Sequence, residues 1–221
     1  MTRPAALFDL DGTLVESGPG IIANIHHAMH HIGRALPETH DLNWVIGPPL
    51  HDIFARLLMD DDKALVQQAA ATYRDTYETV GLLATVLYPG IADTLDQFRA
   101  EGWRLFVATS KPARLARRIL TRLGVADRFE AIFGSVEDGV LDHKPGLLRY
   151  ILDTQGLEAR HTVMIGDRSF DIAGAHANEM RGIGVLWGYG GLAEMEQCGA
   201  DAVAEAPGEL LALASRLARA E

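Results

Sequence analysis

The chain has 221 residues and a formal net charge of −10; hydrophobic residues make up 48% of it and charged residues 23%. This composition is typical of a globular protein with a sizeable core, and the negative charge argues against nucleic acid or an anionic membrane surface as the main partner. The single cysteine, Cys198, excludes an internal disulfide and favours a reducing cytoplasm, and no apolar run predicts a signal peptide or a membrane span.

The first predicted element is a buried strand, "AALFDL" at residues 5–10. Asp9 and Asp11 lie at its carboxyl end, and side chains two residues apart along a strand point to the same face. Gly12 follows and allows a sharp turn, which brings backbone N–H groups close to a ligand. One aspartate here would simply cap a turn, but a pair followed by Gly-Thr predicts a ligand site.

The next seventy residues have a helical pattern. Apolar residues recur at helical spacing in 20–33, and residues 48–59 and 62–81 continue the pattern. Pro48 and Pro49 mark a helix start, and "YPG" at 88–90 marks the return of the chain. We therefore predict an all-helical insert at 17–87 within an α/β core made of residues 1–16 and 88–221.

Two features of this insert look like metal sites but have simpler interpretations. Histidines four residues apart, at 26/30 and 27/31, could bind a transition metal, yet the apolar stripe of the same helix turns them mainly to solvent. The acids of "MDDDK" at 59–63 lie where a helix should begin, and acids there are stabilised by the helix dipole.

From Gly90 onward, β-rich runs alternate with helical segments. The predicted strands are 104–109, 131–135, 162–166, 182–187 and 201–204, and the predicted helices are 112–123, 145–156, 169–179, 190–198 and 207–220. Such alternation predicts an α/β fold, a doubly wound parallel sheet with helices on both faces.

Polar residues gather where these strands end: Thr109 and Ser110, Lys144 before a helix, and Asp167 with Asp171. Open α/β sheets bind ligands at that edge. Clustered carboxylates repel one another and need a cation, and an all-oxygen set without His or Cys favours Mg²⁺. One carboxylate can attack phosphorus, a second can serve as general acid, and a lysine with hydroxyl groups can stabilise phosphoryl charge.

These motifs resemble those of the haloacid dehalogenase superfamily of phosphotransferases over essentially the whole chain. "DLDGT" at 9–13 is similar to the family's Asp-x-Asp-x-Thr motif. The resemblance implies that Asp9 is the nucleophile and a metal ligand. It implies that Asp11 is the general acid/base, with its backbone carbonyl on the metal.

The other three motifs complete the catalytic set that the resemblance implies. Thr109 matches the second motif and Lys144 the third; Asp167 would ligate Mg²⁺, and Asp171 would support Lys144 and the water shell of the metal. The substrate phosphate is expected to lie among Gly12, Thr13, Ser110, Lys111 and Arg168. The helical insert resembles the family's type 1 cap, in a Rossmann-like fold.

The presence of Asp11 favours phosphoryl transfer over dehalogenation. "WGYG" at 187–190 resembles phosphoglycolate phosphatase-like enzymes. "IGPPL" at 46–50 and "GVLWGYG" at 184–190 resemble the bacterial 5′-nucleotidase-like branch of that group, although Ser110 and Gly20 replace a frequent Asn and Asp. We expect a cytoplasmic, monomeric or homodimeric Mg²⁺-dependent phosphomonoesterase that acts on small phosphate esters through an aspartyl phosphate. The alternatives are a sugar phosphomutase with the same aspartates and a non-catalytic phosphate-binding protein.

Substrate choice is expected to lie in the insert, and two classes of substrate stay open. Phosphoglycolate would need a cation for its carboxylate; a nucleoside monophosphate would need aromatic side chains for stacking. The cationic candidates are Arg34, Arg56, Lys63 and Arg74; the aromatic ones are Trp44, Phe54, Tyr73, Tyr77, Trp187 and Tyr189. Phe54 and Tyr77 are expected to pack within the insert.

Overall fold

A six-stranded parallel sheet forms the centre of the molecule in a computed structural model that describes residues 3–37, 41–59, 62–136 and 141–218. The strand order is β5-β4-β1-β6-β7-β8. The strands are β1 (Ala5–Phe8), β4 (Arg104–Pro112), β5 (Ala131–Ser135), β6 (Thr162–Gly166), β7 (Arg181–Val185) and β8 (Ala202–Ala204). Because the chain builds outward from β1 first on one side and then on the other, the predicted doubly wound topology is confirmed.

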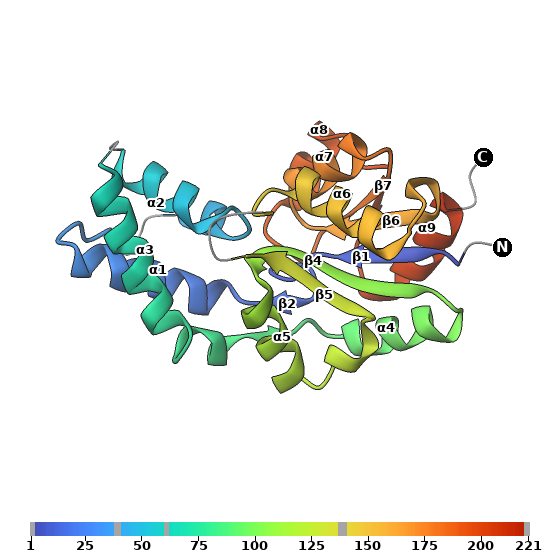
Figure 1. The fold of residues 1–221 in the computed structure, drawn as a ribbon, viewed down its shortest axis with the longest axis horizontal. Coiled ribbons are helices and arrows are strands. Elements are labelled where there is room, and N and C mark those ends of the chain that lie inside the picture. The colour runs from blue at the N-terminus through green and yellow to red at the C-terminus, as the bar shows by residue number, and fades with distance from the viewer. Residues whose placement is uncertain (1–2, 38–40, 60–61, 137–140, 219–221) are drawn as a thin grey trace.

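Alternate residues of the central strand face two separate apolar layers. Ala6 and Phe8 pack in the core with helices α4 (Ile91–Ala100), α5 (Ala113–Arg122) and α9 (Leu210–Leu217). Ala5 and Leu7 pack in the opposite core with α6 (Lys144–Gln155) and α7 (Ser169–Ala177). Figure 1 shows α6, α7 and α8 (Gly191–Gln197) on one side of the sheet and α4 and α5 on the other.

Three further helices, α1 (Gly18–His31), α2 (Leu50–Leu58) and α3 (Lys63–Tyr77), form a bundle at one end of the molecule (Figure 1). Helices α1 and α2 both pack against α3. Asp62 caps α3, because its Oδ1 accepts hydrogen bonds from the N–H groups of Ala64 and Leu65. Capping is therefore the role of this acid, whereas residues 60 and 61 lie outside the described part of the chain.

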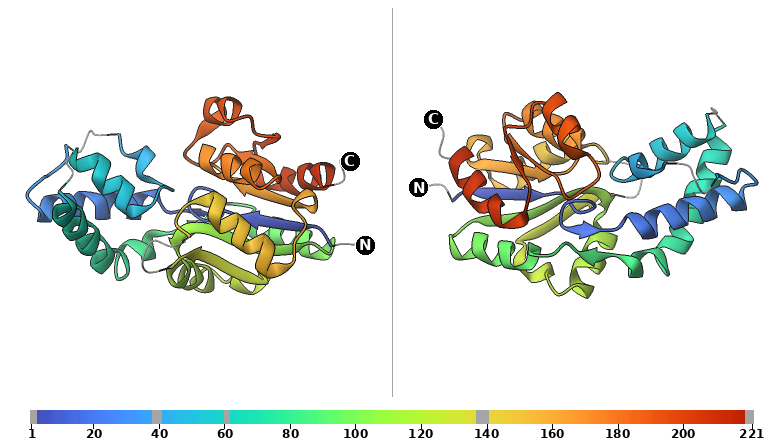
Figure 2. Two further views of the ribbon diagram at one scale, coloured as in Figure 1. Left: turned by 45° about the horizontal axis from the view of Figure 1, so that its top comes forward. Right: turned by 180° about the vertical axis from the view of Figure 1, so that it is seen from behind.

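The chain enters and leaves this bundle through a two-stranded antiparallel ribbon that the sequence pattern does not predict. Its strands are β2 (Val15–Glu16) and β3 (Val86–Leu87), with Val15 opposite Leu87. Figure 2 shows both crossing segments at the junction between the sheet and the bundle. Short 3₁₀ turns occur at Asn43–Val45, Gly81–Ala84, Ala126–Arg128, Ala159–His161 and Pro207–Glu209.

Helix α5 holds the end of the bundle against the sheet. Its arginines at intervals of four residues lie on one face of the helix. Arg114 pairs with the Glu78 carboxylate at 2.5 Å, and Arg118 donates to the Glu78 carbonyl at 2.9 Å. Arg122 donates to the carbonyl of Leu82 at 3.4 Å. The segment that follows α3 is thus attached to the sheet side of the molecule at three places.

Within the described residues, no helix combines the length and the apolar character needed to cross a membrane. The start of β1 and helix α9, near the two ends of the described chain, lie at the end of the sheet opposite the helical bundle (Figure 1).

Candidate active site

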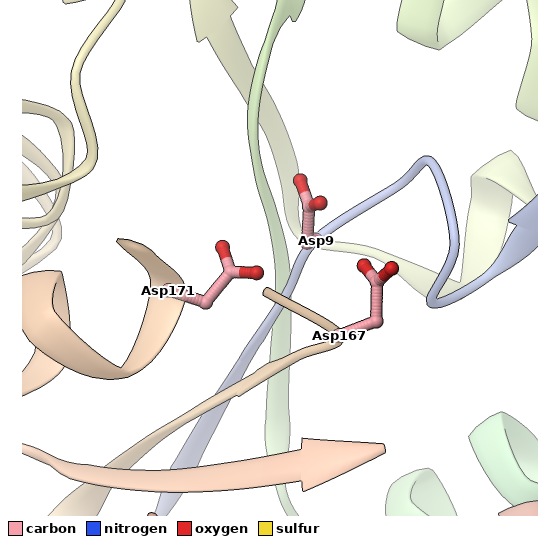
Figure 3. Close-up of side chains that lie close together, drawn as sticks. All are labelled: Asp9, Asp167 and Asp171. Carbon is pink, nitrogen blue, oxygen red and sulfur yellow. The ribbon is translucent and has the colours of Figure 1, made fainter. Parts of the chain in front are cut away.

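Three carboxylates meet at the carboxyl edge of the sheet. Asp9 directly follows β1, Asp167 directly follows β6, and Asp171 lies in the first turn of α7. One oxygen from each lies within 4.8 Å of the others, and the three residues are at most 2% exposed. Figure 3 shows the side chains converging from these elements. Asp9 is fixed in the sheet because its N–H donates to the carbonyl of Ile165 at 2.9 Å.

One buried ammonium group lies against this cluster. Lys144 Nζ is 2.8 Å from Asp9 Oδ1 and 2.8 Å from Asp171 Oδ1, and it donates to the carbonyl of Ala108 at 2.5 Å. Burial lowers the pKa of Lys144, but Asp171 and Asp9 outweigh it, so the pKa is raised overall. The lysine therefore stays charged and fixes the orientation of Asp9.

The cluster still lacks positive charge. Burial raises the pKa of Asp167 well above its usual range, and repulsion from Asp171 and Asp9 adds to this, although the Tyr189 N–H donates to its Oδ2 at 2.8 Å. The three buried carboxylates offer only oxygen donors, and one ammonium group offsets only part of their negative charge. Such a site suits a hard divalent cation such as Mg²⁺. The residues present therefore fit the expected metal.

Two glycines explain how Asp167 fits so tightly. Gly12 has φ +84°, and a Cβ there would lie 2.2 Å from Asp167 Oδ2. A Cβ on Gly188 would lie 2.4 Å from the Cβ of Asp167. Thr13 Oγ1 donates to Asp167 Oδ1 at 3.3 Å. Gly12 and Thr13, expected around the substrate phosphate, thus also shape the position of Asp167.

Asp11 faces a different partner from Asp9. Lys111 Nζ lies 2.6 Å from Asp11 Oδ1 and donates to the Tyr77 hydroxyl at 2.9 Å. Burial lowers the pKa of Lys111, but Asp11 and Tyr77 outweigh it and raise the pKa overall. Thr109 is 1% exposed and its Oγ1 accepts the Lys111 N–H at 3.2 Å. Lys111, expected at the substrate, is therefore also bound to Asp11.

Two other residues expected at the substrate also contact the loop between α1 and α2. Ser110 Oγ donates to the carbonyl of Gly47 at 2.5 Å, and Arg168 donates to the carbonyl of Ile46 at 2.6 Å. Arg168 also pairs with Glu194 at 3.2 Å. Both side chains hold this loop close to the sheet, a role that sequence spacing alone does not reveal.

A cleft of about 850 Å³ opens between the helical bundle and the sheet edge. Asp11, Ser110 and Lys111 line it from the sheet side, and Tyr73, Arg74 and Tyr77 line it from α3. His143, directly before Lys144, is a lining residue that the motifs do not predict. Of the candidate substrate contacts on α3, Tyr73, Arg74 and Tyr77 therefore line the cleft, whereas Lys63 is not among its lining residues in the described part of the chain.

Other candidates for substrate choice have different surroundings. Phe54 is fully buried and packs edge-on against Tyr73, as expected for a residue of the bundle core. The Arg56 guanidinium lies 4.0 Å above the Trp44 ring. Neither Arg56 nor Trp44 is among the residues that line the cleft in the described part of the chain.

Comparisons with known proteins show which family the chain belongs to. The model of the haloacid dehalogenase-like hydrolase family matches residues 6–185, so the chain belongs to this family of enzymes. It is 39% identical to a 5′-nucleotidase of Pseudomonas aeruginosa, over 85% of this chain and 84% of that protein. It is 30% identical to a phosphoglycolate phosphatase of Colwellia psychrerythraea, over 85% and 86%. The resemblance to these two branches is confirmed.

Solved structures share the fold. A predicted phosphatase from Clostridium acetobutylicum superposes with a TM-score of 0.92 at 32% identity, covering 98% of this chain and 100% of that one. Protein Tyrosine Kinase A of Mycobacterium tuberculosis superposes with a TM-score of 0.80 at 35% identity, covering 96% and 99%. The fold therefore occurs in proteins named for phosphate removal and for phosphate transfer.

Proposed function

We propose that this protein is a Mg²⁺-dependent phosphomonoesterase that works through an aspartyl phosphate on Asp9. The observation that carries the proposal is the buried set of three carboxylates around one ammonium group, at the sheet edge where the neighbouring residues Asp11 and Lys111 line the cleft. Asp9, Asp167 and the backbone carbonyl of Asp11 would hold the metal, with Asp171 beside them. The bound metal would supply positive charge to the phosphoryl oxygens.

Each step can be assigned to a side chain. Lys144 holds one oxygen of Asp9, and the carboxylate attacks phosphorus while the bond to the leaving oxygen breaks. Asp11 gives its proton to that oxygen and then takes a proton from the water that hydrolyses the acyl phosphate. Thr109, Lys144 and Lys111, with the loop at Gly12 and Thr13, would stabilise the phosphoryl oxygens.

The substrate is a small phosphate ester of the phosphoglycolate or nucleoside 5′-monophosphate type. A cleft of about 850 Å³ lies within the range of pockets that enclose a whole organic ligand, so it leaves room for a leaving group larger than glycolate. Tyr73 and Arg74 line it and could contact such a group. In this proposal residues 17–87 form a cap over the core of 1–16 and 88–221, and the enzyme acts in the cytoplasm as a monomer or homodimer.

A phosphate-release panel tests the proposal. Phosphoglycolate, nucleoside 5′-monophosphates and sugar phosphates are each incubated with and without Mg²⁺, and inorganic phosphate is measured. Release that requires Mg²⁺ supports the proposal. Isomer conversion without phosphate release would identify a mutase instead, and binding without any turnover would identify a non-catalytic phosphate-binding protein.

A further inference from the structure

Tyr77 of the helical bundle is connected to Asp11 by hydrogen bonds through Lys111. Tyr77 is the last residue of α3 and is 1% exposed. Its hydroxyl accepts a hydrogen bond from Lys111 Nζ at 2.9 Å, and the same ammonium group lies 2.6 Å from Asp11 Oδ1. Lys111 and Asp11 belong to the sheet edge, whereas Tyr77 belongs to the bundle. This chain of contacts is therefore complete only when the bundle lies against the sheet.

The ring of Tyr77 is held in a fixed place. It stacks on Tyr73 with the ring centroids 5.3 Å apart and an interplanar angle of 11°. On another side, a Cβ on Gly81 would lie 2.6 Å from Tyr77 Cδ2, so only a glycine leaves room for the ring. Tight packing on both sides fixes the hydroxyl, and a fixed hydroxyl can fix the flexible Lys111 side chain.

The lysine in turn orients Asp11. An ammonium group has three N–H donors; one serves Asp11 Oδ1 and a second serves Tyr77. The other carboxyl oxygen, Asp11 Oδ2, makes no hydrogen bond to the described part of the protein, and Asp11 lines the cleft. Holding Oδ1 therefore leaves Oδ2 available to the leaving group of a substrate.

We propose that Tyr77 is a positioning residue that couples closure of the bundle to proton transfer by Asp11. The inference rests on the proposed role of Asp11. As the bond from Asp9 to phosphorus forms and the bond to the leaving oxygen breaks, the proton on Asp11 Oδ2 moves to that oxygen. Asp11 enters this step protonated on Oδ2 and leaves it as a carboxylate, whose charge the Lys111 ammonium at Oδ1 stabilises, so that the lysine favours release of the proton. Without the Tyr77 hydroxyl, the ammonium and the carboxyl group lose their common orientation.

The test is a leaving-group comparison with Tyr77→Phe, which keeps the stacked ring and removes only the hydroxyl. The matched control is Tyr150→Phe, because Tyr150 is 45% exposed and packs on Phe133, away from the site. The value of kcat/KM is measured for para-nitrophenyl phosphate, which releases a stable anion. The value of kcat/KM is also measured for an alkyl phosphate, chosen from phosphoglycolate, glycerol 2-phosphate and 5′-AMP as the one that the wild type hydrolyses fastest. In all three, the leaving oxygen must receive a proton as its bond to phosphorus breaks.

We expect Tyr77→Phe to lower kcat/KM about tenfold on the alkyl phosphate, the scale of one hydrogen bond to a charged group, and less than about twofold on para-nitrophenyl phosphate. Tyr150→Phe should change neither value. An equal loss on both substrates, or no loss on either, would overturn the proposal, because a merely structural role of Tyr77 does not depend on the leaving group.

A double-mutant cycle adds a second readout. In a Lys111→Met background, Tyr77→Phe should have less than a twofold further effect, since the hydroxyl acts through the lysine. An undiminished effect would contradict the inference. Asp9→Asn separates the two proposals: if it stays active, the proposed function is wrong, whereas an inactive Asp9→Asn with an unaffected Tyr77→Phe refutes only the positioning role.

Discussion

At the scale of single residues, Asp9 combines the features of an attacking group. It is 2% exposed, and Lys144 holds one of its oxygens at 2.8 Å. Asp9→Asn keeps the shape but removes the negative charge, so we expect turnover to fall at least about a thousandfold with the fold retained. Steady-state kinetics and circular dichroism check this, and a near-native rate would refute the nucleophilic role.

Asp167 illustrates a conflict between stability and function. Its pKa is raised by burial and by neighbouring carboxylates, so its folded pKa lies above the unfolded one. Without metal, the folded state therefore binds more protons than the unfolded state at pH values between the two pKa values. The free energy of unfolding then falls as the pH rises from the usual aspartate range through the raised pKa. Asp167→Asn removes this penalty and should stabilise the metal-free protein at neutral pH by about 0.5–2 kcal/mol.

The same substitution should abolish the stabilisation that Mg²⁺ gives the wild type. Thermal unfolding in EDTA and in Mg²⁺ measures both effects, with Asp153→Asn as a control because Asp153 is exposed and pairs with Arg149 on the surface of α6. A less stable Asp167→Asn protein in EDTA would contradict the charge-deficit account of the site.

The sequence could indicate which residues meet at the site but not all of their contacts. The motif spacing places Asp9, Asp167 and Lys144 at strand ends, and the structure brings them together. The sequence could not show that Ser110 and Arg168 donate hydrogen bonds to the loop at 46–47, because such contacts depend on how the bundle packs against the sheet. Tyr77 looked like a packing residue, and its ring does pack, but its hydroxyl reaches Lys111.

At the scale of elements, we expect the start of α1 to serve as a hinge between the bundle and the sheet. The Gly18 N–H donates to the Tyr189 hydroxyl at 2.8 Å, and a Cβ at Gly18 would lie 2.7 Å from that oxygen. Gly18→Pro removes the donor, stiffens the backbone and displaces Tyr189. We expect slower turnover of nucleoside 5′-monophosphates with Mg²⁺ affinity nearly unchanged.

The control for this hinge is Gly208→Ala, since a Cβ at Gly208 meets no atom within 4 Å. Steady-state kinetics on 5′-AMP and Mg²⁺ titration followed by thermal shift provide the two readouts. An unchanged turnover number in Gly18→Pro would show that this junction does not move during catalysis.

The elements themselves differ in how far the sequence predicts them. Strands β5 and β6 match the expected bounds, because each is a continuous apolar run between polar segments. Helix α4 was not predicted, although Ile91, Leu95 and Phe98 recur on one helical face. The β2–β3 ribbon has two residues in each strand and pairs positions about seventy residues apart, so no local pattern could predict it.

At the scale of the whole molecule, we expect the excess negative charge of the site to make activity dependent on a bound metal. EDTA should abolish phosphate release and Mg²⁺ should restore it, and at a hundred times its Kd Mg²⁺ should stabilise the fold by about 2.7 kcal/mol. Ca²⁺ should inhibit, because its longer bonds and higher coordination number displace Asp9 from phosphorus. Full activity after thorough chelation would exclude a metal role.

In the proposed function, the sheet edge carries out the chemistry and the helical bundle determines substrate choice. The catalytic candidates lie on the rigid sheet edge, whereas Tyr73 and Arg74 face the same cleft from α3. Closure of the bundle would exclude water and strengthen electrostatic interactions with the phosphoryl group. Substitution of Arg74 should therefore change the ranking of substrates more than the rate on a generic aryl phosphate.

Trapping the phosphorylated enzyme tests the central claim most directly. Wild-type protein is mixed with Mg²⁺ and a substrate it hydrolyses, quenched in acid during turnover, digested and analysed by mass spectrometry, with Asp9→Asn treated in parallel. We predict one added phosphoryl group on the peptide that contains Asp9, located at Asp9 and absent from the variant. Turnover with the phosphoryl group on another residue, or with none during phosphate release under rapid quench, would contradict the account.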